Sequence, residues 1–154
     1  PFWLEHSLDR QLGGQFNSLD HDGTIFDTDK SMWLQGRAVW MFSKLYNEVE
    51  QHDDWLEAAT HIYDFLIKHG FDTDGRMFFS VTQDGRPIQK RRYLFTETFA
   101  IIACQNMRGQ RTTQSRWSVP LIYIDWWLTI YGIQRNSHPS SSAKHVKLKP
   151  TIFL

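Results

Sequence analysis

The chain has 154 residues, of which 41% are apolar and 15% aromatic, which argues against global disorder and allows one packed domain. Its net charge of zero hides a split, because residues 1–104 carry a net −6 and residues 105–154 a net +6. A single cysteine, Cys104, excludes a disulfide framework and a multi-cysteine metal site and suits a reducing, cytoplasmic compartment. No run approaches the roughly 18 consecutive apolar residues of a membrane span.

Helical periodicity dominates the first two thirds of the chain. Residues 2–8 have the pattern of the end of a helix, and residues 31–48 and 54–69 are predicted to form two longer helices. Residues 94–104 are predicted to begin another helix. In the helix at 31–48, the side chains at helical spacing are Trp33, Arg37, Trp40, Met41 and Leu45.

Three residues are predicted to mark the ends of these helices. Asp29 and Asp53 precede the two long helices and are the residue type that accepts backbone N–H groups at an N-cap. Gly70 follows the second long helix, where glycine commonly adopts the left-handed conformation.

Two β-hairpins are predicted between the helices, at Asp22-Gly23 and Asp84-Gly85, because glycine accepts positive φ in a tight turn. The two hairpins are 62 residues apart, and each stands at an equal distance from a following apolar helix. The spacing indicates a repeated hairpin–helix–helix unit, and stacked units of this kind form a toroid of helix pairs. Other matches at this offset pair Phe16 with Phe78, Ser18 with Ser80 and Ala38 with Ala100.

Residues 105–154 have a different character. The run Val119–Ile133 is aromatic and β-branched, the segments around it are loop-like, and no third copy of the repeat follows. We therefore predict an N-terminal domain over residues 1–104 and an irregular basic tail over residues 105–154. The basic tail by itself leaves nucleic-acid binding as one alternative.

Several motifs in the first 104 residues resemble the start of the N-acylglucosamine 2-epimerase family. Their order and spacing fit over residues 2–104, and the Met-Trp-Leu-Gln-Gly-Arg run is the most specific of them. The motifs are Phe2-Trp3-Leu4-Glu5-His6-Ser7-Leu8-Asp9-Arg10, Asp20-His21-Asp22-Gly23, Phe26-Asp27-Thr28-Asp29-Lys30 and Met32-Trp33-Leu34-Gln35-Gly36-Arg37. The resemblance implies an all-α fold, the N-terminal third of an (α/α)6 barrel with two β-hairpins between its helices.

The resemblance also implies an activity: interconversion of N-acetylglucosamine and N-acetylmannosamine by abstraction of the C2 proton. Relatives that epimerise cellobiose or isomerise aldoses and ketoses keep those activities open as alternatives. A non-catalytic interaction protein or pseudoenzyme is a further alternative. The resemblance also implies no metal or redox cofactor and a small-molecule sugar as partner, rather than nucleic acid or membrane. It leaves a homodimer open for the full-length protein.

Four residues are expected to bind the sugar. Arg37 matches the family's arginine that binds sugar oxygens, and its place on one helical stripe with Trp33 predicts a guanidinium directed into the hollow of the barrel. Trp33 is expected to stack on a sugar face. Glu97, which the repeat aligns with Gln35, and Tyr93 stand at the entry of the next helix and are expected to contact hydroxyl groups.

The resemblance places the two proton-transferring histidines in later helices, so we expect no catalytic residue in this stretch and no activity of the chain alone. The resemblance ends near Cys104, where the charge changes sign. If the codons of the tail are read with a shift of two bases, one permitted amino-acid sequence looks like the family's continuation. We therefore expect that the tail is translated out of frame. The nucleotide sequence around the Cys104 codon would test this expectation.

Overall fold

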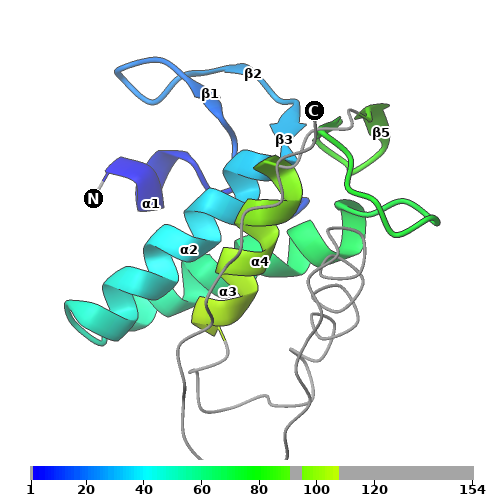
Figure 1. The fold of residues 1–154 in the computed structure, drawn as a ribbon. Coiled ribbons are helices and arrows are strands. Elements are labelled where there is room, and N and C mark those ends of the chain that lie inside the picture. The colour runs from blue at the N-terminus through cyan, green and yellow to red at the C-terminus, as the bar shows by residue number, and fades with distance from the viewer. Residues whose placement is uncertain (1, 91–94, 108–154) are drawn as a thin grey trace, which may run out of the picture.

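The computed structural model describes residues 2–90 and 95–107, and helices make up about half of this part of the chain (Figure 1). In chain order the elements are α1 (Phe2–His6), β1 (Ser18–Leu19), β2 (Ile25–Asp27), β3 (Lys30–Ser31), α2 (Met32–Glu48), α3 (Asp53–His69), β4 (Ser80–Val81), β5 (Pro87–Gln89) and α4 (Phe95–Met107). The expected helices and hairpins are therefore present.

Helix α2 packs against both α3 and α4, and the main apolar cluster lies among these three helices (Figure 1). The buried side of α2 includes Met32, Val39 and Phe42, whereas Trp33 and Trp40 are half-buried and Arg37 is exposed. Of the side chains at the predicted spacing, Met41 and Leu45 pack against the main apolar cluster. Trp33, Arg37 and Trp40 lie on a side of the helix that other described elements leave partly uncovered.

The two hairpins confirm the predicted repeat. Strand β1 pairs with β2 through Ser18 with Asp27 and Leu19 with Ile25, and the pairing of β4 with β5 has the same register 62 residues later. Both ladders carry an irregularity at the same place, and the turn glycines Gly23 and Gly85 both have φ near +90°. The hairpins lie at the end of the helices where α2 and α4 begin (Figure 1).

A third strand connects the two repeats, which the sequence did not predict. Strand β3 immediately precedes α2 and pairs antiparallel with β4, through Lys30 with Val81 and Ser31 with Ser80. The result is a three-stranded sheet in the order β3-β4-β5. This pairing fixes the start of α2 to the second hairpin.

The two predicted N-caps were wrong, whereas Gly70 does end α3 but not in the expected left-handed conformation. Ser31, rather than Asp29, is the N-cap of α2, because β3 runs directly into the helix. Asp53 is the first residue of α3 and follows the N-cap His52. Gly70 has φ −79°, a right-handed conformation in which its N–H bonds the Leu66 carbonyl oxygen.

Residues 108–154 of the predicted tail and Tyr93 lie outside the described residues. Residues 105–107, expected to begin the irregular tail, instead form the end of α4. Within the ranges that the structure describes, every helix is too short or too polar to cross a membrane.

Candidate functional site

An aromatic cleft opens beside the first turns of α2 and α4. Its lining residues are Trp33 from α2, Phe79 from the segment before β4, and Phe95, Thr96 and Phe99 from α4. The cleft has a volume of about 530 Å³. Ligand sites for small molecules are typically concave and lined by aromatic side chains with a few polar groups, so this cleft is the candidate binding site.

Trp33 of α2 and Phe99 of α4 contact each other through their rings where the two helices line the cleft. Their ring centroids are 5.9 Å apart with planes inclined at 43°, a tilted aromatic contact. Phe95, one turn earlier on α4, is 71% exposed. Trp33 therefore lines this cleft, and its stacking on a sugar face stays a prediction, while the three phenylalanines were missed. Phe95 and Phe99, four residues apart, were the available signal for an aromatic helix face.

Arg37 follows Trp33 by four residues, so the two side chains leave the same side of α2. The guanidinium is exposed, and no described residue forms a hydrogen bond or ion pair with it. It lies one turn along α2 from the cleft and is not enclosed by the described elements. A free cation beside an aromatic wall can bind oxygen-rich ligands, since arginine carries five N–H donors.

Glu97 is buried beneath the segment that leads into the second hairpin. Its Oε1 accepts a hydrogen bond from the Met77 backbone N–H at 3.5 Å and lies 3.9 Å from Arg76 Nε. Its Oε2 is buried and has no partner among the described residues. Thr96, the neighbouring residue, lines the cleft, whereas Glu97 does not.

Gln35 occupies the same place as Glu97 in the first repeat. Its Oε1 accepts from the Gln15 N–H at 2.9 Å, and its Nε2 donates to the Gln15 carbonyl oxygen at 2.8 Å. Gln15 and Met77 are also 62 residues apart. The alignment of Glu97 with Gln35 is therefore confirmed, and only the glutamine uses both of its polar atoms on the backbone.

No histidine of the described ranges lines the aromatic cleft. The rings of His6 and His69 lie against the hairpin glycines Gly23 and Gly85, and His21 is exposed on the first hairpin. His52 is the N-cap of α3. The described residues likewise contain no group of three His, Cys, Asp or Glu side chains able to hold a metal ion.

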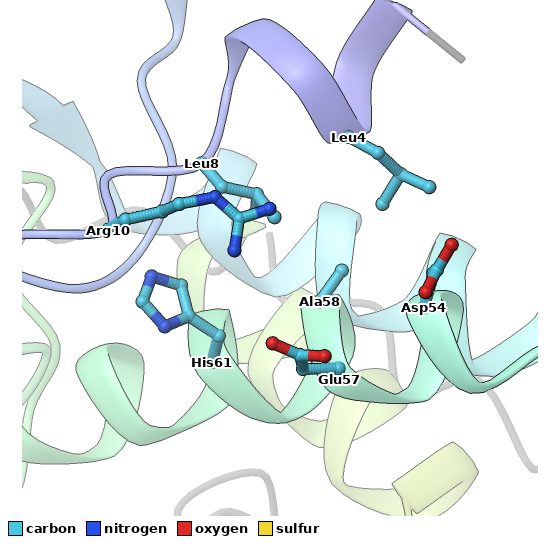
Figure 2. Close-up of a pocket in the computed structure, with 7 residues that line it drawn as sticks. All are labelled: Leu4, Leu8, Arg10, Asp54, Glu57, Ala58 and His61. Carbon is cyan, nitrogen blue, oxygen red and sulfur yellow. The ribbon is translucent and has the colours of Figure 1, made fainter.

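A second, polar hollow of about 190 Å³ lies between the N-terminal segment and α3. Figure 2 shows Arg10 on one side and Glu57 and His61 of α3 on the other. The Nε2 atom of His61 lies 2.9 Å from the Asp9 carbonyl oxygen, so this ring is already engaged with the backbone. None of the residues that line this hollow also lines the aromatic cleft.

Residues 14–118 match the family model described as N-acylglucosamine 2-epimerase (GlcNAc 2-epimerase). The N-acylglucosamine 2-epimerase of Homo sapiens is 37% identical over 110 residues, which cover 69% of this chain and 26% of that protein. The cellobiose 2-epimerase of Dictyoglomus turgidum is 31% identical over 135 residues, covering 86% of this chain and 32% of that protein.

Solved structures agree with these relatives. The cellobiose 2-epimerase from Bacillus thermoamylovorans matches with a TM-score of 0.68 and 25% identity, covering 86% of this chain and 32% of that one. A D-mannose isomerase matches with a TM-score of 0.71 at 18% identity, which speaks for the fold alone. The chain thus spans between a quarter and a third of the length of its relatives. On the family match and the shared fold, it belongs to the N-acylglucosamine 2-epimerase family.

Proposed function

We propose that this chain provides a sugar-binding wall of a carbohydrate 2-epimerase that interconverts N-acetylglucosamine and N-acetylmannosamine. The observation that carries the proposal is the placement of Trp33 and Phe99 in one cleft, with the free guanidinium of Arg37 one turn away on the same side of α2. A pyranose ring has an apolar C–H face and a rim of hydroxyl groups. The aromatic rings suit the face, and the guanidinium suits the oxygens.

Arg37 is proposed to stabilise the negative charge that develops during the reaction. Removal of the C2 proton from an open-chain aldose leaves an enolate-like oxygen at C1. A fixed cation directed at such an oxygen lowers the barrier, because the charge appears where the donor already stands. Arg37 is suited to this role because no described residue neutralises it.

Inversion at C2 also needs a base on one face of the carbon and an acid on the other, each contributing about 10²–10⁴-fold. None of the five histidines in the described ranges lines the cleft, and His61 is engaged with the Asp9 carbonyl oxygen. We therefore propose that the proton-transferring pair comes from later parts of the barrel. On this proposal the chain alone binds sugar without epimerising it.

Glu97 and Tyr93 complete the proposed sugar-contacting set. The Glu97 Oε2 lacks a partner among the described residues, and we propose that it accepts a hydrogen bond from a sugar hydroxyl that enters past Thr96. A buried carboxylate oxygen without a donor is costly, so a site that supplies a donor on binding would gain affinity. Tyr93 lies outside the described residues and is proposed on its position before α4.

The two stacked repeats are proposed to be part of an (α/α)6 barrel. Each repeat has a hairpin at the same end of the helices, and α2 and α4 carry the cleft residues on their uncovered side. Further helix pairs would continue the ring and enclose this side. Phe95 and Arg37 are exposed, as is expected of residues on the open side of an incomplete ring.

A second candidate is epimerisation of a disaccharide. The cellobiose 2-epimerase of Dictyoglomus turgidum matches 86% of this chain, against 69% for the human N-acylglucosamine 2-epimerase, although at lower identity. The same cleft and the same arginine would serve either substrate at the reacting ring. The two candidates differ in whether a second sugar ring has room beside the first.

The test uses ligand-observed saturation-transfer NMR on the purified chain with N-acetylmannosamine, N-acetylglucosamine and cellobiose. We expect signal transfer to the N-acetyl sugars, lost in Arg37→Met and retained in Arg10→Met. Arg10 is a suitable control because it is also exposed but lines the polar hollow. Exchange of the C2 proton in deuterated water should stay at background. No binding by the unaltered chain, or equal loss in both variants, would refute the proposed site.

A further inference from the structure

The polar hollow between the N-terminal segment and α3 carries opposite charges on its two sides. Figure 2 shows the Arg10 guanidinium entering from the N-terminal segment and the Glu57 carboxylate facing it from α3. Asp54 lines the same hollow three residues earlier on α3, a spacing that puts both carboxylates on one side of the helix. The hollow therefore has a cationic side and an anionic side.

These charged groups face each other without pairing. Within the described ranges, no side chain forms an ion pair or a hydrogen bond with the charged group of Arg10 or Glu57. The Oδ2 atom of Asp54 lies 3.6 Å from the Nδ1 atom of His52, a contact between two exposed side chains. A ligand that carries both a positive and a negative group can pair with both sides of the hollow at once.

The backbone that carries Arg10 is held firmly. The Asp9 carbonyl oxygen, directly before Arg10, accepts a hydrogen bond from His61 Nε2 of α3 at 2.9 Å. The Asp9 carboxylate accepts the backbone N–H groups of the two residues after Arg10, both at 3.1 Å, and also binds the buried ammonium of Lys30. A ligand bound by Arg10 therefore has only a side chain to order, which lowers the entropic cost of binding.

Apolar side chains complete the lining of the hollow. Leu4 and Leu8 from the N-terminal segment are half-buried, and Ala58 of α3 is buried. An aliphatic group in contact with them would be removed from water, which favours binding. Sites for drug-sized ligands have volumes of about 300–1,000 Å³, so a hollow of about 190 Å³ suits a smaller molecule.

We infer that this hollow binds a small zwitterionic ligand, an α-amino acid with a short aliphatic side chain. The carboxylate of the ligand pairs with Arg10, because a planar guanidinium can donate two parallel N–H bonds to a carboxylate. The ammonium group pairs with Glu57 and Asp54, and the aliphatic group contacts Leu4 and Leu8. The inference does not depend on the proposed sugar site, since the hollow and the cleft share no lining residue.

Ligand-observed saturation-transfer NMR on the full chain with glycine, L-alanine and L-valine tests the inference. At roughly 10 mM, where even a millimolar site is mostly occupied, we expect signal transfer to all three and the tightest binding for L-valine, which has the largest apolar group. Two analogues each remove one charge: L-valinamide lacks the carboxylate, and N-acetyl-L-valine lacks the ammonium group. Each analogue should bind about tenfold more weakly than L-valine, because a charge-assisted contact is lost.

Variants of the hollow should respond to the matching analogue. Arg10→Met and Glu57→Gln should each weaken L-valine binding about tenfold. L-valinamide should bind Arg10→Met and the unaltered chain equally, and N-acetyl-L-valine should do the same for Glu57→Gln, because a missing contact cannot be lost twice. Arg86→Met and Glu48→Gln are the matched controls, since both residues are exposed outside the hollow, and neither change should alter L-valine binding.

A second readout is the stability of the fold. A ligand that joins the N-terminal segment to α3 binds only the folded chain, so urea midpoints of the unaltered chain should rise with L-valine concentration. The same titration of Arg10→Met should show little rise.

Three results would overturn the inference. The first is that none of the three amino acids binds. The second is that L-valinamide or N-acetyl-L-valine binds as tightly as L-valine, because the hollow would then take a simple cation or a simple anion. The third is that Arg10→Met and Arg86→Met weaken L-valine binding equally, which would place the site elsewhere. A failure of the unaltered chain to bind sugar refutes the proposed function alone and leaves this inference standing.

Discussion

The Nζ atom of Lys30 lies 2.8 Å from the Oδ2 atom of Asp9, and both side chains are almost completely buried. Lys30 also donates to the carbonyl oxygens of Gly13, at 2.6 Å, and Gln83, at 3.0 Å. Its three N–H groups therefore have partners in the N-terminal segment and in the second hairpin. The ammonium group joins the two repeats at the point where β3 leads into α2.

Lys30→Met is expected to destabilise the chain strongly, by roughly 3–5 kcal/mol, because it leaves the Asp9 carboxylate buried without its cation. The free energy of unfolding from urea titration checks this. Lys44→Met is the matched control: Lys44 pairs with Glu48 on the exposed side of α2, and such pairs contribute at most about 1 kcal/mol. Equal effects of the two variants would contradict a stabilising role for the buried pair.

Acid should weaken the fold through Asp9. Burial raises the pKa of Asp9, but hydrogen bonds from Lys30, Gln83 and two backbone amides outweigh it and hold the pKa below its ordinary value of 3.8. Because the folded pKa is the lower one, this contribution is complete above about pH 3.8 and is lost as the pH falls through the folded value. Urea midpoints measured from pH 6 to pH 2 should decline, and Asp9→Asn should flatten that decline.

His69 should weaken the fold in a different pH range. Burial, together with the nearby charge of Lys68, lowers the pKa of His69 below its ordinary value of 6.5. The folded chain therefore favours the neutral ring, and stability present above pH 6.5 should fall as the pH drops toward the folded pKa. Asp84 opposes this effect, and Lys30 adds to it.

His69→Phe keeps an aromatic ring beside Phe65 and should remove the loss of stability between pH 7 and pH 5. His21→Phe is the control, because His21 is exposed on the first hairpin. Thermal unfolding midpoints of both variants, measured between pH 7 and pH 5, test this expectation. A pH slope that persists in His69→Phe would show that another group is responsible.

Glu97→Gln is expected to stabilise the chain by about 1 kcal/mol, because the amide can donate to the Met77 carbonyl oxygen as Gln35 does to that of Gln15. The reciprocal change Gln35→Glu should cost a similar amount. Chemical denaturation measures both. If Glu97 serves the sugar as proposed, Glu97→Gln should also weaken sugar binding, a stability gain at the expense of function. A destabilised Glu97→Gln would contradict the equivalence of the two positions.

The sequence by itself determined the positions of the long helices, both hairpins and their repeat, because each depends on local periodicity or on a glycine turn. It also pointed to Trp33 as a cleft residue. It could not by itself decide which side of α2 is buried, since the apolar spacing of Trp33 and Trp40 looks the same whether that side faces a core or an open cleft.

Only the tertiary structure decided the contacts between residues far apart in the chain. The pairing of β3 with β4, the burial of Lys30 against Asp9 and Gln83, and the crossing of Gly36 with Phe99 join segments separated by 21 to 63 residues. Such contacts leave no periodic signal, because each depends on how two elements come together after both have formed. Hydrophobic pattern sets which elements exist, while close packing and buried hydrogen bonds set where they meet.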